Sequence, residues 1–189
     1  MEQAPSFDVV AKQLSGALLG YLQRYLGDRH AAEDVLQESL LRIAKALPDF
    51  EGRASVKTWA FRIATNAAID YLRRSKNAAL IVPFEEKHGI PGDDEGTDDR
   101  IVIDEMNDCI REEIDSLPET YRAAILLHDL EGLTAAQTAE ATGCSLANAK
   151  VRIRRARARL QQALARDCTF YREGEQPLRC DRKHPRDEA

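Results

Sequence analysis

The chain has 189 residues, a formal net charge of −5, 43% hydrophobic residues and only 6% aromatic residues. This length suits one ordinary domain or two small ones, and a core poor in aromatic rings favours packed helices over a β-sandwich. No apolar run reaches the roughly 18 residues of a membrane span, and the first residues lack the basic and apolar segments of an export signal. The four cysteines are too few for a disulfide scaffold. Together these features predict a cytoplasmic protein without membrane insertion.

Residues 8–78 are predicted to form a first domain of three helices. Apolar residues recur at helical spacing, and the pattern breaks at Gly27 and again at Pro48. Ser55 precedes the third helix and can serve as its N-cap. We expect these helices at residues 9–25, 29–47 and 56–75.

The third of these helices combines aromatic, amide and cationic side chains. Between Glu51 and Asn77 six residues are basic and two are acidic, and Trp59, Arg62 and Asn66 lie in this stretch. Aromatic rings, amides and guanidinium groups are the side chains that bind unstacked single-stranded bases. Trp59 also lies on the apolar stripe of the helix, however, where a tryptophan is more often part of the core.

Residues 79–105 are interpreted as an acidic linker. The segment 83–105 contains nine acidic and two basic residues, with several prolines and glycines and no helical or strand periodicity. This composition is typical of a flexible, self-repelling joint, whereas surface loops of this length are uncommon within one compact domain. We therefore expect two domains that can occupy separate parts of a large partner.

A second domain of four helices is expected over residues 106–166. Its lead-in helix is predicted to run from about residue 99 to 115. Ser116 and Glu119 fit a capping box, in which each side chain bonds to the backbone N–H near the other residue. This box predicts the start of a helix that continues to about Leu130.

The last two helices have the spacing of a helix-turn-helix. Thr134 and Gln137 fit a capping box, Gly143 fits the turn, and Ser145 can cap the long final helix. Residues 146–166 contain seven basic residues and no acidic residue, in a chain whose net charge is negative. The seven are Lys150, Arg152, Arg154, Arg155, Arg157, Arg159 and Arg166. A cationic helix on an acidic protein indicates a partner that carries phosphate.

The final helix also separates an apolar side from a cationic side. Apolar residues recur at steps of three or four from Ala149 to Leu164 and can pack on the preceding helices. A solvated arginine-rich helix or a coiled coil is the alternative, but a coiled coil needs three or four heptads and this segment is shorter. The turn, the caps and the charge together favour DNA binding.

Four stretches in series resemble the extracytoplasmic-function (ECF) group of bacterial sigma factors, the promoter-recognition subunits of RNA polymerase. They are AAEDVLQESLLRIAKAL (31–47), FEGRASVKTWAFRIATNAAIDYLRR (50–74), LPETYRAAILLHDLEGLTAAQTAEATGC (117–144) and SLANAKVRIRRARARL (145–160). A helix-turn-helix alone is widespread, but all four stretches in this order are specific. The resemblance implies an all-α fold of two small helical domains, joined by the acidic linker and followed by a short tail that contains cysteines. It also implies binding to core RNA polymerase and promoter DNA, with no cofactor and no enzymatic activity.

The resemblance assigns two tasks to the first domain. An acidic helix is implied to dock on core polymerase through Glu33, Asp34, Leu36, Gln37 and Glu38. From the residues alone, these carboxylates could also be an ordinary solvated face. The following loop and the third helix are implied to capture a flipped base of the promoter −10 element and to contact the duplex beside it. The matching positions are Phe50, Arg53, Lys57, Trp59, Arg62, Asn66, Asp70, Arg73 and Arg74.

The second domain resembles the family's reader of the −35 element, whose recognition helix lies in the major groove. The matching positions are Ser145, Lys150, Val151, Arg152, Arg154, Arg155 and Arg157. Arginine or lysine bonded to guanine is the commonest specific base contact. Val151 and Arg154 differ from the residues usual in relatives, which leaves the −35 sequence open. The resemblance also implies an anti-sigma factor as a partner, and we expect the free chain to be a monomer.

A stand-alone helix-turn-helix regulator is the alternative from a different class. Such a regulator needs a dimer interface and binds a palindrome as a free protein, and no dimer seam is visible in the sequence. An enzyme is not expected, because no nucleophile–base pair, glycine-rich phosphate loop or metalloprotease motif is found.

Residues 167–189 lie outside the common core of the family. Cys168 and Cys180 stand on either side of Gly174, which predicts a small hairpin that brings the two thiols together. Three interpretations stay open: a zinc site that also uses His184, a reversible redox pair, or an ordinary packed tail. The paired C-x-x-C spacing of most zinc sites is missing, and we predict no metal.

Overall fold

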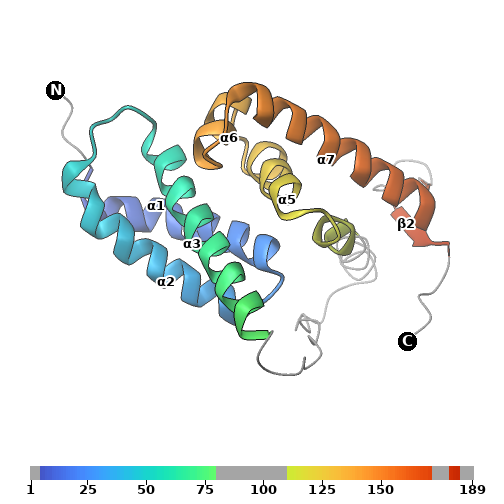
Figure 1. Ribbon diagram of the computed structural model, residues 1–189, viewed down its shortest axis with the longest axis horizontal. Helices are drawn as coiled ribbons and strands as arrows, with labels where there is room; N and C mark the ends of the chain where they lie inside the picture. Colours follow the sequence, from blue (N-terminus) through green and yellow to red (C-terminus); the bar gives the residue numbers. More distant parts are fainter. Residues whose placement is uncertain (1–4, 80–109, 172–178, 184–189) are drawn as a thin grey trace.

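The computed structural model describes residues 5–79, 110–171 and 179–183 of the chain. Within these ranges the fold is all-α apart from one short hairpin, and the helices form two lobes (Figure 1). The predicted linker, residues 79–105, falls outside the described residues except for its first position.

The N-terminal lobe consists of three long helices whose ends are set by local caps. Gly27 ends the first helix in the left-handed region (φ 69°), which glycine adopts without steric cost. The Asp28 carboxylate caps the second helix by accepting a hydrogen bond from the N–H of Ala31 (2.7 Å). Ser55 caps the third helix, as predicted, by accepting from the N–H of Thr58 (3.1 Å). The elements are α1 (Phe7–Leu26), α2 (Arg29–Ala46), the 3-10 turn η1 (Leu47–Asp49) and α3 (Val56–Ala79).

Aromatic rings between α1 and α3 form the centre of this lobe. Tyr21 is fully buried, meets Phe61 edge-on (centroids 5.5 Å apart) and stacks on Tyr25 (5.7 Å). Thr65 donates its only hydroxyl proton to the carbonyl of Phe61 (2.7 Å), so the Tyr21 hydroxyl donates to Thr65 Oγ1 (3.0 Å). Burial raises the pKa of Tyr21, and it raises the pKa of Tyr25 to about 12. Both phenols therefore stay neutral near pH 7, and Tyr21 joins α1 to α3 through Phe61 and Thr65.

The capping box predicted at Ser116 and Glu119 is wrong. Pro118 occupies the N-cap position and has no side-chain hydrogen bond, while the Ser116 hydroxyl donates to the carbonyl of Glu113 (2.8 Å). Glu119 pairs with Lys76 of α3, because the two lobes meet at this point. The helix that begins here ends in a single turn of π-helix. Its parts are α5 (Glu119–Ile125) and η2 (Leu126–Leu130).

The helix-turn-helix is confirmed, with each predicted cap in place. Both hydrogen bonds of the Thr134–Gln137 capping box are present. Gly143 adopts a positive φ of 63° in the turn, and Ser145 Oγ accepts from the N–H of Asn148 (3.2 Å) at the start of the recognition helix. The two helices are α6 (Ala135–Ala141) and α7 (Leu146–Asp167). Of the predicted lead-in helix, residues 110–115 are helical, and the earlier part lies outside the described residues.

The predicted C-terminal hairpin is present directly after α7. Strands β1 (Cys168–Tyr171) and β2 (Arg179–Arg182) pair antiparallel. Their register places Cys180 opposite Phe170 and Cys168 opposite Arg182. In this register the two cysteines occupy diagonal positions of the hairpin and not directly opposed ones.

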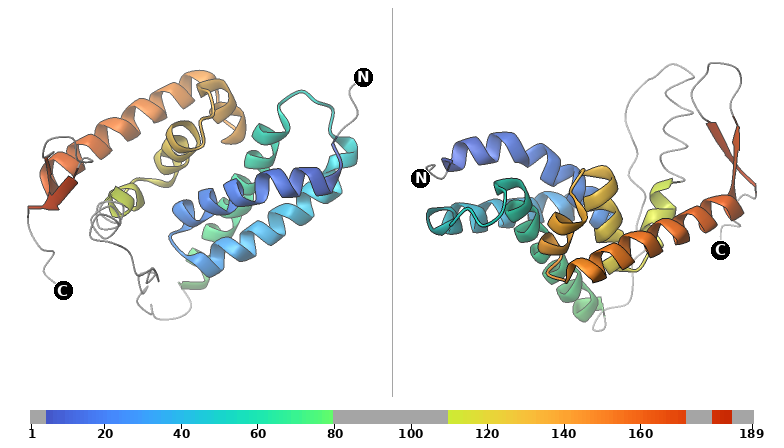
Figure 2. Two further views of the ribbon diagram at one scale, coloured as in Figure 1. Left: turned by 180° about the vertical axis from the view of Figure 1, so that it is seen from behind. Right: turned by 90° about the horizontal axis from the view of Figure 1, so that it is seen from above.

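The two lobes pack against each other through a continuous set of buried apolar residues. This set includes Leu22 and Phe61 from the first lobe and Leu126, Leu133 and Ala141 from the second. Helix α6 lies beside α3 in both views of the molecule (Figure 2). The fold thus brings the N-terminal end of α3 next to the helix-turn-helix.

Candidate nucleic-acid interface

A hollow of about 500 Å³ lies at the N-terminal end of α3. The rings of Phe50 and Trp59 stand against each other on its wall, with centroids 5.0 Å apart. Arg53 and Arg62 line the same hollow, and Arg53 is bonded to Glu51 (2.9 Å) and otherwise exposed. Trp59 is half-buried, so it packs on the core with one side and lines the hollow with the other. The core role and the base-binding role are therefore compatible.

The exposed side of α3 continues this surface along the helix. Arg62 and Asn66 are exposed and lie one helical turn apart. Asp70, one turn beyond Asn66, lies 3.6 Å from Arg42. Arg74, one turn further along α3, donates a hydrogen bond to Glu38 of α2 (3.2 Å). An exposed guanidinium, amide and aromatic ring in one row are suited to a nucleic-acid strand.

The residues predicted for polymerase docking lie on α2, but they do not all point the same way. Asp34 and Gln37 are exposed, whereas Leu36 packs against the core. Glu33 pairs with Arg29 (3.0 Å). The fifth member, Glu38, accepts hydrogen bonds from Arg42 and Arg74. The outward-facing part of the predicted set is therefore small.

Glu38 joins α2 to α3 through charge. Burial acts to raise the pKa of its carboxyl, but hydrogen bonds from Arg42 and Arg74 outweigh burial and hold that pKa below its usual range. The bond from Arg42 is 2.5 Å long. The carboxylate is therefore ionised near neutral pH and keeps both guanidinium groups beside it.

Leu41 is a surface residue that sequence reasoning missed. Its side chain is 64% exposed and lies two turns along the α2 face that carries Asp34 and Gln37. The signal was available in the sequence, because Leu41 stands off the apolar stripe that packs α2 on the core. An exposed leucine among acidic residues fits a protein-binding face.

Helix α7 packs on the C-terminal lobe through a narrow stripe of buried residues: Ala149, Ile153 and Ala156. Most of its circumference therefore stays open. Val151, 39% exposed, lies on the side of α7 opposite this buried stripe, and Lys150, Arg154 and Arg155 are exposed around it. Arg152 is half-buried, and Ser145 acts as the N-cap. The structure thus presents most of the predicted −35 residues on one outer face.

Arg157 is paired with an acidic side chain of the same lobe. Its guanidinium binds both carboxylate oxygens of Asp129, with Nε 2.8 Å from Oδ2. The hydrogen bonds and the charge of this carboxylate raise the pKa of Arg157. The pair neutralises the cation, so Arg157 offers less charge to a phosphate than its position in the sequence indicates.

Polar contacts between the lobes involve residues of the predicted −10 surface. The Glu131 carboxylate, 8% exposed, binds Arg24 of α1 (2.6 Å), and the Glu131 carbonyl accepts from Lys57 Nζ (2.6 Å). Arg122 donates to the carbonyl of Tyr25 (3.0 Å). Glu140 of α6 lines the same hollow as Phe50 and Trp59. In this arrangement the C-terminal lobe covers one side of the predicted base-capture surface.

The tail shows no metal cluster within the residues that the structure describes. Cys168 is buried at the end of α7, whereas the side chain of Cys180 and all of His184 lie outside the described residues. The redox interpretation therefore stays a prediction. Within the same described ranges, no helix has both the length and the apolar character to cross a membrane.

Comparison with known proteins matches both lobes. The family model for Sigma-70 region 2 matches residues 10–78, and the model for Sigma-70 region 4 matches residues 107–160. The RNA polymerase sigma-H factor of Pseudomonas aeruginosa is 30% identical over 167 residues, which is 84% of this chain and 86% of that protein. The ECF RNA polymerase sigma-E factor of Haemophilus influenzae is 28% identical, covering 84% of this chain and 87% of that protein.

Solved structures show the same fold. The sigma factor RpoE of Bartonella quintana, solved in complex with the anti-sigma factor NepR, superposes with a TM-score of 0.70 at 24% identity, covering 84% of this chain and 96% of that one. CnrH, solved in complex with the cytosolic domain of CnrY, gives a TM-score of 0.60 at 23% identity, over 84% of this chain and 87% of that one.

The chain belongs to the sigma-70 family, in its ECF group. It is a sigma factor, a transcription initiation factor that acts with core RNA polymerase on promoter DNA. The alternative of a stand-alone regulator is not favoured, because the N-terminal lobe matches sigma region 2.

The ion pair between Arg24 and Glu131 gives a test of the lobe contact. Arg24→Glu places two carboxylates together at a poorly solvated site, which should favour separated lobes by on the order of 2 kcal/mol, roughly thirtyfold in population. Small-angle X-ray scattering of the free chain should show a larger radius of gyration.

The charge-swapped variant, Arg24→Glu with Glu131→Arg, is the control and should return the radius towards the wild-type value. An unchanged radius in Arg24→Glu would show that this pair does not hold the lobes together.

Proposed function

We propose that the chain divides promoter recognition among three surfaces. The outer face of α2 docks on core polymerase, the hollow before α3 captures a base of the −10 element, and the outer face of α7 reads the −35 element. The main support for this proposal is the hollow at the N-terminal end of α3. It combines two aromatic rings, Phe50 and Trp59, with Arg62, and the exposed Asn66 lies one helical turn beyond Arg62 on α3.

These side chains match the chemistry of strand capture. A base that leaves the duplex loses stacking worth a few kcal/mol, and an aromatic wall restores part of it. Arg53, Arg62 and Lys57 supply charge for the backbone, and Asn66 supplies an amide for a base edge. Arg73 and Arg74, with Asp70, are proposed to lie beside the duplex upstream. Capture of the exposed strand drives opening in this scheme, so the chain needs neither ATP nor a catalytic residue.

On α2, the proposed docking face consists of Asp34, Gln37 and Leu41, with Glu38 at its edge. The carboxylates suit a basic partner surface, and the exposed Leu41 adds an apolar contact. Leu36, which packs inward, contributes by fixing the helix.

For the −35 element, Lys150, Arg154 and Arg155 are proposed to face the bases, around Val151. Arg152 lies nearer the phosphates. Arg157 is proposed to stabilise the lobe through Asp129 as much as to bind DNA.

We propose that two promoter boxes are reached by separation of the lobes. The domains would be residues 8–78 and 106–166, with residues 79–105 as the joint and 167–189 as an appended tail. Lys57 is bonded to Glu131 and Glu140 stands at the hollow, so the packed arrangement competes with DNA for the −10 surface. An anti-sigma factor is a proposed partner, by analogy with the RpoE complex. The place of action is the cytoplasm, where polymerase and DNA are found.

Asp34→Lys should weaken binding to core polymerase about tenfold or more at low salt, because it reverses a charge on the docking face. The loss should shrink as salt rises, since salt screens exposed charges. Competition with a fluorescently labelled wild-type chain for purified core polymerase measures both effects.

Leu41→Ala removes only the apolar contribution of the docking face. It should weaken binding to core polymerase to a similar extent at every salt concentration. Asp8→Lys, at an exposed acid on α1, is the matched control and should leave the affinity unchanged. Unchanged affinity in both Asp34→Lys and Leu41→Ala would exclude this face of α2 as the docking site.

Asn66→Ala should impair strand opening while leaving formation of the closed complex intact, because the amide meets a base only after the strand has separated. Permanganate reactivity of unpaired thymines should fall roughly tenfold, in line with the loss of one good base contact. Gln13→Ala, an exposed amide on α1, is the control. Equal reactivity in Asn66→Ala and wild type would remove Asn66 from the base-capture site.

A further inference from the structure

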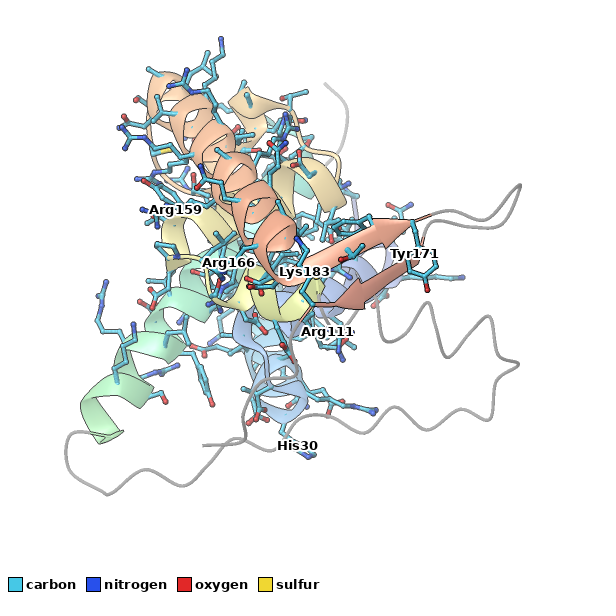
Figure 3. The ribbon with its side chains drawn as sticks, turned by 90° about the vertical axis from the view of Figure 1, so that its right-hand side faces the viewer. His30, Arg111, Arg159, Arg166, Tyr171 and Lys183 are labelled. Carbon is cyan, nitrogen blue, oxygen red and sulfur yellow. The ribbon has the colours of Figure 1, made fainter. Side chains whose placement is uncertain are left out.

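Tyr121 stands where α5 meets the cationic flank of α7. Its ring is half-buried against the core of the C-terminal lobe, so the position of the ring is fixed by packing. The guanidinium carbon of Arg159 lies 5.1 Å from the centre of this ring. Arg159 projects from α7 (Figure 3). This separation is within the range of a cation–π contact.

The arginines of this flank also act on the phenol. Hydrogen bonding and charge from Arg155, and the charges of Arg159 and Arg152, hold the pKa of Tyr121 below its usual range. Arg152, Arg155 and Arg159 are spaced three and four residues apart, so they share one flank of α7. One tyrosine therefore lies beside a single stripe of arginines and contacts Arg159 of that stripe through its ring.

The two flanks of α7 use different kinds of partner. On one flank Asp129 binds Arg157, and a carboxylate cancels the charge of the cation it holds. On the other flank the partner is a neutral phenol, which restrains a guanidinium and leaves its charge available for phosphate or guanine. Restraint matters because an arginine that binds DNA loses rotamer freedom, at a cost that is smaller when the side chain is already ordered.

We infer that Tyr121 is a positioning residue of the DNA interface, which holds Arg155 and Arg159 ready for the promoter duplex without neutralising them. This inference rests on the proposed reading of the −35 element by α7. Tyr121 was not among the residues singled out from the sequence, because its role depends on contact with a helix some thirty positions away.

The test uses the holoenzyme and the −35 duplex that the wild-type holoenzyme selects from a random library. Tyr121→Phe keeps the ring and its packing but removes the hydroxyl. It should weaken specific binding roughly threefold to tenfold, the range expected for one arginine that must be ordered on binding. Tyr121→Leu, which also removes the cation–π contact with Arg159, should weaken it further. Tyr71→Phe, on α3, is the matched control and should have no effect on this duplex.

A double-mutant cycle with Arg155→Ala separates positioning from a general effect on folding. In the Arg155→Ala background, Tyr121→Phe should have no further effect. An equal loss in both backgrounds, or no loss in Tyr121→Phe at all, would overturn the inference. If Arg155→Ala itself binds like wild type, the proposed base-reading role of Arg155 fails instead.

A spectroscopic signature completes the test. The chain is titrated to alkaline pH while phenolate absorbance is recorded. Subtracting the curve of Tyr121→Phe from that of the wild type isolates Tyr121, which should ionise at lower pH than an ordinary tyrosine. Arg155→Ala should move this transition to higher pH, because the donor and the charge that favour phenolate are gone. If Tyr121 ionises at the same pH in Arg155→Ala as in the wild type, Arg155 does not act on this phenol and the inference fails for Arg155.

Discussion

The close packing of α3 against its neighbours is the constraint on which the other features of this sigma factor depend. Ala60, Ala64, Ala67 and Ala68 are fully buried along this helix, and α3 contacts α1, α2 and α6. Small side chains let helices approach closely on several sides. One strip of α3 stays open, and it carries Arg62 and Asn66. The helix therefore connects the proposed polymerase-docking face on α2, the proposed base-capture hollow and the second lobe.

For the charged side chains of this protein, the groups that they pair with matter more than the number of charges. Glu38 on α2 pairs with Arg42 of the same helix and with Arg74 of α3, so the proposed docking helix and the proposed DNA-contacting helix share one ionic cluster. On α7, Asp129 pairs with Arg157 on one flank, and the ring of Tyr121 lies against Arg159 on the other. Exposed ion pairs contribute little to stability. Their main effect here is to decide which cations are available to DNA.

Much of this architecture could be predicted from the sequence, because its signals are local. The Gly27 break, the Ser55, Thr134 and Ser145 caps and the Gly143 turn each depend on a few neighbouring residues, and all are present. The Ser116–Glu119 box failed because Pro118 took the N-cap position and Lys76, from the other lobe, bound Glu119. The partners of Arg157 and Lys57 depend on helix packing. No spacing rule within one helix contains that information.

The two lobes are expected to read two promoter boxes only as part of a polymerase. The decisive experiment is run-off transcription of a genomic fragment library, with core polymerase in the presence and absence of this chain. Discrete transcripts should then need the chain and share two sequence boxes at a fixed separation. If the chain instead gave core polymerase no promoter preference and bound a palindromic site tightly on its own, the two lobes would not act as a promoter-reading pair.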